Sequence, residues 1–298
     1  MAITINGARF LAYAASKGLA LRQTTVVGRQ GLFAPPSLLR TVLRQNGIAP
    51  GPADEAFFSG GAAAWADPVF HALGARELEF LDASPYEGAT RLHDLNRPVA
   101  LNWAESTDTL IDAGSLEHVF DVKTAVENYL RLVRVGGSVV LLDMPAVSLC
   151  GHGFYQFSPE FFCEVFSAKH GFELVTLAVA EDWAFAPFYS VARPRDVRQR
   201  VEMLSDFPGH IFVHARKIAP FHGFEKSIVQ SDYAEAWGRD LPPERQAPPA
   251  AGLLEPLRRI WRKVDLAGYW KFSTRRNKRL WRRRARVGRS AQLQPLEI

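Results

Sequence analysis

An unbroken apolar run, Val139 to Leu142, is the feature that most restricts the fold of this chain. A short run that is apolar on both faces is typical of a strand buried between two layers of helices in a parallel sheet. The preceding segment, Glu117 to Val133, has apolar residues at helical spacing and predicts a helix, and Gly136-Gly137 turns the chain between the two elements. A helix that leads into a buried strand indicates an α/β protein.

Six other segments have the composition of strands, and most are separated by helical or loop sequence. With the apolar run, the seven expected strands are Thr24–Val27, Leu78–Asp82, Ala89–Leu92, Thr109–Ala113, Ser138–Leu142, Phe172–Ala180 and His210–Arg216. Strands that alternate with helices form mainly parallel sheets. We therefore expect an α/β fold with a mainly parallel seven-stranded sheet and helices on both faces.

Positive charge is concentrated near the C-terminus. The 298-residue chain has a formal net charge of +5, and residues 275–289 hold nine Lys or Arg and no acid, so the remainder sums to about −4 (5 − 9). A mildly acidic body makes nucleic acid an unexpected partner. Trp281 among the arginines favours an anionic membrane surface for this segment, and a solvated end without a partner is the alternative.

The composition along the chain predicts three regions. These are an N-terminal extension of residues 1–22, a domain of residues 23–220, and a proline-containing linker with a basic Trp/Arg-rich tail over residues 221–298. No apolar run approaches the roughly 18 residues of a membrane span, and the first residues lack a signal-peptide layout. We expect a cytoplasmic protein, peripheral at the inner membrane face if the tail binds lipid. Cys150 and Cys163 lack zinc-site spacing, so free thiols and no metal site are expected.

The residues that follow the expected strands are the candidate site residues, because ligands of open parallel sheets bind beyond the carboxyl ends of the strands. In chain order these residues are Gly28, Gly31, Asp82, Ser84, Asp94, Asp112 and Gly114. Glycine lets the backbone approach a cofactor closely, and an acid after the second strand can accept the hydroxyls of a ribose. An acid after the third strand suits an adenine amine, so the set predicts a nucleotide-like ligand.

Several motifs resemble a known family. Residues 110–121 (LIDAGSLEHVFD) and 132–137 (LVRVGG) resemble the fourth and fifth strands of class I S-adenosylmethionine-dependent methyltransferases. Residues 81–96 (LDASPYEGATRLHDLN) and 151–162 (GHGFYQFSPEFF) resemble a bacterial branch of methyltransferase-like proteins. The resemblance covers roughly residues 23–217. It implies a Rossmann-like fold with an antiparallel last strand, and S-adenosyl-L-methionine as the cofactor.

The resemblance also implies a role for each candidate residue. Gly28, Gln30 and Gly31 are expected near the methionine part of the cofactor, Asp82 and Ser84 at the ribose, Asp94 near the adenine, and Asp112 and Gly114 along its flank. The glycine loop reads GRQG here, and its Arg29 and Gln30 replace small residues. This departure from the family pattern predicts altered, weakened or lost cofactor binding.

His152 is the candidate general base, with Tyr155 beside it, because the loop after the fifth strand faces the acceptor in this fold. Glu117 and His118 are interpreted as the start of a helix, where the dipole favours a carboxylate. The main hypothesis is a methyltransferase acting on a small-molecule, sugar or glycan-precursor acceptor. The alternative is a non-catalytic Rossmann-like binding or scaffold protein that has lost the cofactor. A nicotinamide-dependent enzyme is a weaker third hypothesis, since GxGxxG is missing.

Overall fold

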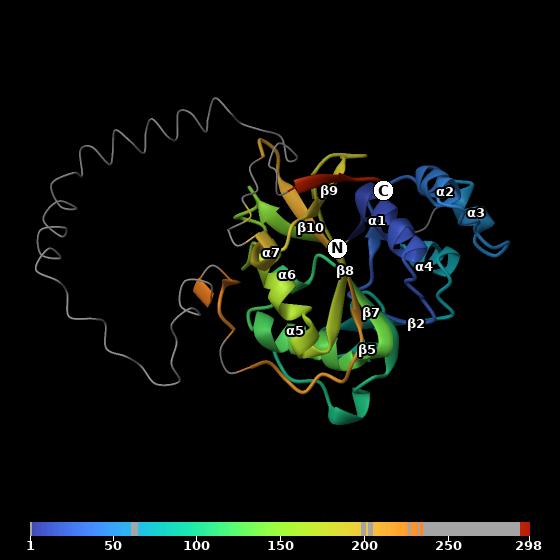
Figure 1. Ribbon diagram of the computed structural model, residues 1–298. Coiled ribbons are helices and arrows are strands. Elements are labelled where there is room, and N and C mark those ends of the chain that lie inside the picture. Colours follow the sequence, from blue (N-terminus) through green and yellow to red (C-terminus); the bar gives the residue numbers. More distant parts are fainter. Residues whose placement is uncertain are drawn as a thin grey trace, which may run out of the picture.

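The computed structural model describes residues 2–60, 65–197, 201, 205–225, 228–231, 233–234 and 293–298 (Figure 1). Within these residues the main sheet has nine strands in the order β11-β9-β8-β10-β7-β6-β2-β4-β5. The strands are β2 (Gln23–Val27), β4 (Glu77–Asp82), β5 (Arg91–Leu92), β6 (Thr107–Ala113), β7 (Val133–Val147), β8 (Phe172–Glu181), β9 (Phe188–Val191), β10 (Gly209–Lys217) and β11 (Leu293–Leu296). A separate small sheet pairs β1 (Ala2–Ile3) with β3 (Gly31–Leu32).

Seven of the nine strands run in the same direction. The strands from β5 through β4, β2 and β6 to β7 are joined by parallel pairs. β10 is antiparallel to both β7 and β8, and β9 is antiparallel to both β8 and β11. The prediction of a mainly parallel sheet is confirmed. The predicted count of seven is wrong, because β9 and β11 extend the sheet beyond β8 and add further antiparallel pairs.

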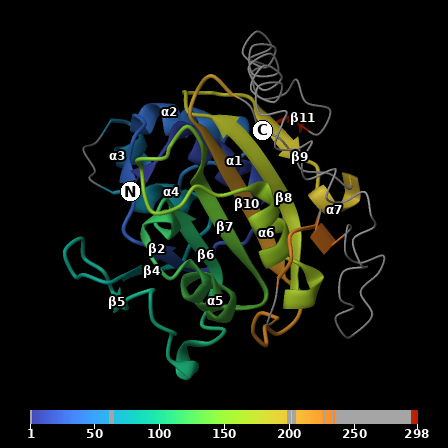
Figure 2. The ribbon, with the colours of Figure 1, turned by 90° about the vertical axis from the view of Figure 1, so that its left-hand side faces the viewer.

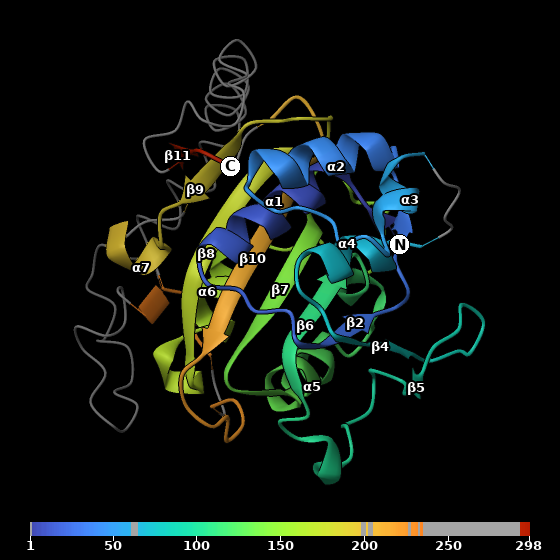
Figure 3. The same cartoon turned by 90° about the vertical axis from the view of Figure 1, so that its right-hand side faces the viewer.

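Helices cover both faces of the sheet (Figures 2 and 3). One face carries α1 (Ile5–Ser16), α2 (Pro36–Gln45) and α4 (Asp67–Ala72), and the other carries α5 (Val122–Leu132) and α6 (Pro159–Val165). The shorter elements are α3 (Glu55–Phe58), α7 (Pro194–Val197) and the 3-10 turns η1 (Leu101–Trp103), η2 (Leu116–His118) and η3 (Ala168–His170).

The apolar run at the centre of β7 supplies two cores at once. Val139 and Leu141 belong to the apolar cluster that also contains residues of α5 and α6, whereas Val140 and Leu142 belong to the cluster around α1, α2 and α4. All four side chains are at most 1% exposed. Successive strand residues point to opposite faces, so a strand covered on both sides needs apolar residues at every position.

The N-terminal segment is part of the folded core, which corrects the expected extension of residues 1–22. α1 begins after Thr4, whose hydroxyl accepts a hydrogen bond from Gly7 N at 2.8 Å. Phe10 and Leu11 are fully buried against the sheet, and β1 pairs with β3. Burying one face of α1 stabilises the domain by removing apolar surface from water, so residues 2–16 cannot be separated from it.

The C-terminal end also returns to the sheet, which corrects the expected tail of residues 221–298. Residues 293–296 form β11, drawn in red in Figure 1, and pair with β9. The basic segment 275–289 lies outside the described residues. No helix of the described part is both long and apolar enough to cross a membrane. Cys150 and Cys163 are free thiols, as predicted, and burial raises the pKa of Cys163 to about 12.

Candidate functional site at the strand ends

The order of the strands fixes where a ligand can bind. From β2 the chain moves outward to β4 and β5, and then returns to β6 on the other side of β2. In open α/β sheets the crevice at such a reversal, beyond the carboxyl ends of the strands, is the usual ligand site. The predicted site residues follow β2, β4, β5 and β6, so they lie at this edge.

Hydrogen bonds tie the neighbouring strand ends together at the crevice. The three contacts are Gly28 N to Leu81 O at 2.8 Å, His93 N to Asp82 O at 2.8 Å, and Ser115 Oγ to Val27 O at 3.2 Å. Gly28 has a φ of +63°, which lies in the left-handed region that favours glycine. The structure therefore brings the Gly28 turn, Asp82 and the segment before Asp94 to adjoining positions.

Asp82 and Asp94 each close a short turn in the loop after their strand. Asp82 Oδ1 accepts a hydrogen bond from Ser84 N at 3.0 Å. Asp94 Oδ1 accepts from the backbone and the side-chain amide of Asn96, and these bonds lower the pKa of Asp94. Asp82 is half-buried and Asp94 is exposed. Each turn is held through Oδ1 of its aspartate.

Asp112 is an internal residue, which corrects its predicted position along a cofactor. Its carboxylate is fully buried and accepts hydrogen bonds from Ser115 N, Leu116 N and the Tyr129 hydroxyl. Burial raises the pKa of Asp112, and the hydrogen bonds from Tyr129 and Ser115 oppose that shift. Asp112 thus holds the turn after β6 from inside the protein, and Gly114 in this turn has a φ of +91°.

Gln30 is also internal, so its predicted contact with the cofactor is wrong in this conformation. The side chain is fully buried, and its Nε2 donates to Val27 O at 2.8 Å and to Gly28 O at 3.3 Å. Gln30 therefore occupies the end of β2 and stabilises the turn in which it sits. Gly28 is buried as well, with its N–H bonded to Leu81 O and its carbonyl to the Gln30 amide, whereas Gly31 is half-buried.

Arg29 is held by the start of α4, by Trp65 just before it and by β4. Its guanidinium forms a 2.7 Å ion pair with Asp67 and lies 5.0 Å from the ring centroid of Trp65 and 4.9 Å from that of Phe80. Ion pairing and cation–π contacts stabilise this position. Arg29 and Gln30, the two residues of the GRQG turn that depart from the resembled pattern, thus both bind other parts of the protein.

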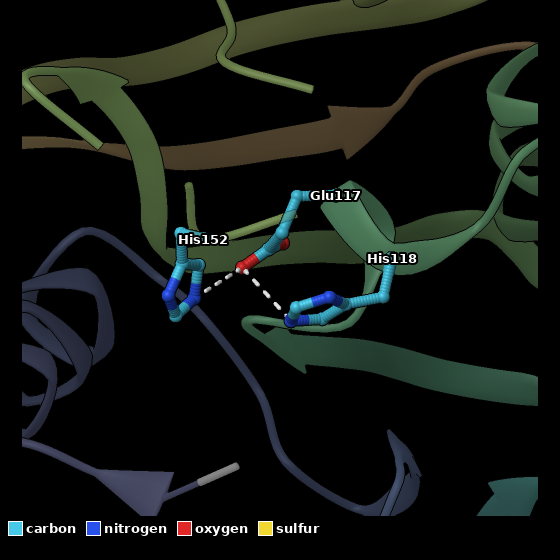
Figure 4. Close-up of side chains that lie close together, drawn as sticks. All are labelled: Glu117, His118 and His152. Atoms are coloured by element: carbon cyan, nitrogen blue, oxygen red, sulfur yellow. Dashed lines mark ion pairs between the residues drawn. The ribbon is translucent and has the colours of Figure 1, made fainter. Parts of the chain in front are cut away.

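A second group of side chains lies across the ends of β6 and β7. Glu117 belongs to η2, directly after β6, and His152 belongs to the loop between β7 and α6. Oε1 of Glu117 lies 3.4 Å from Nε2 of His152 and 4.0 Å from Nε2 of His118 (Figure 4). The helix expected from Glu117 begins instead at Val122, because Asp121 caps it by accepting from Thr124 N.

Close backbone packing holds Glu117 and the His152 loop together. Phe154 N donates to Glu117 O at 2.8 Å. A Cβ on Gly153 would lie 2.8 Å from the same oxygen, so the approach requires glycine at this position. The Glu117 carboxylate is fully buried, and burial together with the charge of Asp112 raises its pKa to about 8. Burial and the neighbouring His152 lower the pKa of His118.

Tyr155 has a role different from the predicted one. Its hydroxyl donates to Phe120 O at 2.6 Å, which ties the loop after β7 to the segment before α5. Glu117, rather than Tyr155, is therefore the residue the structure brings to His152. Next to this loop the exposed rings of Phe120 and Phe154 meet edge to face at 5.5 Å and form an apolar rim.

Glu117 and His118 are functional candidates that sequence reasoning missed. Glu117 was interpreted as the start of a helix, where the helix dipole stabilises a carboxylate, and so it was not counted as a site residue. The available signal was positional, because Glu117 and His118 directly follow one buried strand and His152 follows the adjacent one. Neighbouring parallel strands end at the same edge of the sheet, so these three side chains could have been predicted to lie close together.

Comparisons with known proteins show similarity in fold alone. No family model matches the chain, and no curated protein matches its sequence. Among solved structures, a putative methyltransferase from Bacillus halodurans C-125 has 10% identity and a TM-score of 0.39, over 72% of this chain and 100% of the other. The N-methyltransferase NodS from Bradyrhizobium japonicum WM9 has 12% identity and a TM-score of 0.39, over 72% and 96%.

A branched-chain polyamine synthase mutein from Thermus thermophilus has 14% identity and a TM-score of 0.38, over 77% of this chain and 60% of its own. Identities and TM-scores this low do not establish a family. The fold and the strand-end residues define a doubly wound α/β protein with a candidate ligand site at its topological switch point.

Proposed function

We propose that this chain is an S-adenosylmethionine-dependent methyltransferase acting on a small-molecule, sugar or glycan-precursor acceptor. The observation that carries the proposal is the hydrogen-bonded row of strand ends that places the Gly28 turn beside Asp82 and the loop of Asp94. An adenosine bound at the ends of parallel strands needs such a row, with a carboxylate at its ribose.

The residues at the strand ends fit this cofactor in two respects. Asp82 offers a half-buried carboxylate beside the Gly28 turn, and Asp94 is exposed one strand further along. The reversed strand β10, inserted between β7 and β8, agrees with the antiparallel strand that the motif resemblance implies.

When bound, S-adenosylmethionine supplies an activated methyl group, so the protein chiefly has to position the acceptor. The loop of His152 follows β7 at the same edge of the sheet, with the apolar rim of Phe120 and Phe154 beside it. A hydroxyl acceptor bound against this rim would give its proton to His152 as its oxygen takes the methyl group. General-base assistance of this kind is worth roughly 100-fold or more in rate.

A non-catalytic binding protein is the second candidate, and one observation favours it. The buried Gln30 amide fills the end of β2, where a loop of small residues would leave more room for a cofactor. A protein of this kind would keep the crevice for another ligand or for a scaffold role. The two candidates differ in whether the crevice binds S-adenosylmethionine.

Isothermal titration calorimetry with S-adenosylmethionine and S-adenosylhomocysteine separates the candidates. We expect micromolar binding, weakened at least 10-fold by Asp82→Asn because the variant replaces an anionic acceptor of ribose hydroxyls with a neutral amide. Glu173→Gln, at an exposed position near the start of β8 and hence at the opposite edge, is the matched control and should bind as the unchanged protein does. An absence of heat at millimolar ligand would support the non-catalytic candidate.

The basic segment 275–289 is proposed to contact an anionic membrane surface, which would make the protein peripheral at the inner face. Its nine cationic residues and Trp281 suit the headgroup region of such a surface. Cosedimentation with vesicles of phosphatidylglycerol and phosphatidylcholine tests this. Binding should depend on the anionic lipid and fall with added salt, and equal binding to neutral vesicles would contradict it.

A further inference from the structure

Glu117 holds an unusual position for a carboxylate. Its side chain is 0% exposed, and neither oxygen has a hydrogen-bond partner among the described residues. An ionised carboxylate buried without a partner is costly, so such groups in proteins are paired with cations or coordinate metals. The imidazoles of His118 and His152, which can carry a positive charge, both approach the same oxygen, Oε1.

The three side chains form a compact set of ligand atoms. The chosen oxygen of Glu117 and one ring nitrogen each of His118 and His152 all lie within 4.8 Å of one another. In tetrahedral coordination with bonds of about 2.0–2.1 Å, neighbouring ligand atoms are about 3.3 Å apart. The 3.4 Å separation between Glu117 and His152 fits that value, and the 4.0 Å separation to His118 needs a shift of about 0.7 Å (4.0 − 3.3).

The donor set itself points to a transition metal. Two imidazoles and one carboxylate are the ligands of catalytic zinc sites and of other sites that keep positions open, whereas Ca²⁺ and Mg²⁺ prefer oxygen ligands. The histidines are half-exposed, at 48% and 50% of their side-chain area. An ion held between them would have a buried anionic ligand on one side and an open side toward solvent.

We propose that Glu117, His118 and His152 bind one divalent transition-metal ion, with zinc as the best-fitting probe, and leave at least one coordination position open for an oxygen ligand. The site is built rather than incidental, because the Gly153 backbone is packed against Glu117 and fixes the loop that carries His152. If the proposed function holds, that oxygen belongs to the acceptor, whose hydroxyl the ion would acidify so that its proton passes to solvent water as the oxygen takes the methyl group. His152 Nε2 would then be a ligand instead of the proton acceptor.

The test uses the full chain without a polyhistidine tag, freed of metal with a chelator and titrated with ZnCl₂ against a chromophoric competitor. We expect one ion per chain, and binding weakened at least 100-fold in Glu117→Gln and in His152→Ala. Replacement of zinc by Co²⁺ should give visible absorption typical of nitrogen and oxygen ligation, and Glu117→Gln should abolish it. His93→Ala, at the same edge but outside the cluster, is the matched control and should bind as the unchanged protein does.

Circular dichroism distinguishes lost ligation from lost folding, and Glu117→Gln keeps the shape of the side chain. Zinc binding that is the same in the unchanged protein and in Glu117→Gln or His152→Ala would overturn the proposal, as would an absence of stoichiometric binding. These measurements need no S-adenosylmethionine. Metal binding without cofactor binding would refute the proposed function and support the metal site. Cofactor binding without metal binding would refute the metal site and support the proposed function.

Discussion

The carboxylate of Glu117 lies 3.4 Å from the imidazole of His152, although 34 residues separate them in the sequence. The contact exists because β6 and β7 are parallel neighbours that end at the same edge. Gly153 makes it possible, since its backbone lies against Glu117 O where any side chain would collide.

Gly153→Ala is therefore expected to disturb this contact. Its Cβ would lie 2.8 Å from Glu117 O, so the loop must shift and the hydrogen bond from Phe154 N must lengthen or break. We expect a loss of about 1–3 kcal/mol in the free energy of unfolding, typical of overpacking, and weaker zinc binding. Gly151→Ala, whose Cβ meets nothing within 4 Å, is the matched control. Equal urea midpoints for the two variants would contradict this account of Gly153.

Tyr129→Phe tests the internal role of Asp112. The Tyr129 hydroxyl donates to Asp112 Oδ2 at 2.9 Å, and both side chains are fully buried. Removing the donor leaves a buried carboxylate oxygen with one bond fewer, so we expect a loss of about 1–3 kcal/mol in urea denaturation. Tyr13→Phe, in a less buried position on α1, should change stability by far less. A neutral effect of Tyr129→Phe would show that Asp112 does not depend on this bond.

Asp143 predicts a pH dependence of stability. It is half-buried next to Thr4, whose hydroxyl donates to Oδ2 at 3.0 Å, and loss of solvation raises its pKa to about 7. The folded protein thus holds a proton at Asp143 that the unfolded chain releases above its ordinary pKa of 3.8. Its contribution to stability is complete below pH 3.8 and is lost as the pH rises to about 7.

Asp143→Asn should remove this contribution to the pH dependence. Asparagine keeps the shape and tolerates the φ of +53°, so the variant should gain stability relative to the unchanged protein between pH 4 and pH 7. The size of that relative gain is on the order of a few kcal/mol, at about 1.4 kcal/mol per pKa unit. Thermal unfolding across this range measures it, and parallel pH profiles for the two proteins would contradict the raised pKa.

Lys217 is expected to stabilise the fold by binding the C-terminal end of α5. Its ammonium group is buried and donates to Leu130 O at 3.0 Å and to Val133 O at 2.7 Å, carbonyls at the helix C-terminus. Lys217→Met keeps much of the length but leaves these carbonyls without the cation, so we expect a loss of about 2–4 kcal/mol. Lys123→Met removes an exposed ion pair and should cost under about 0.5 kcal/mol. Similar losses in both variants would contradict this role.

Much of the fold was predictable because hydrophobic patterns report burial directly. The unbroken run of β7 could only be a strand covered on both faces, and all seven expected strands are present. The edge strands were missed, since β9 lies in an aromatic-rich loop and β11 comes from residues 293–296, about 100 residues later. Pairing over that distance leaves no local pattern in the sequence.

The site was predictable in position and less so in detail. Gly28, Asp82 and Asp94 could be predicted to lie at one edge of the sheet, because they follow strands that run in the same direction. Which polar side chains turn inward is decided by packing, and so the sequence did not reveal that Gln30 and Asp112 are buried. The cluster of Glu117 with two histidines likewise depends on a loop closure that the Gly153 backbone makes possible.

A crystal structure of the protein grown with S-adenosylhomocysteine would show whether the strand ends bind an adenosine. We expect the adenosine at the ends of β2 and β4, with ribose hydroxyls bonded to Asp82, the Gly28 turn beside the amino-acid part, and the sulfur directed toward the ends of β6 and β7. Ligand density at another edge of the sheet, or an empty crevice at saturating ligand, would contradict it.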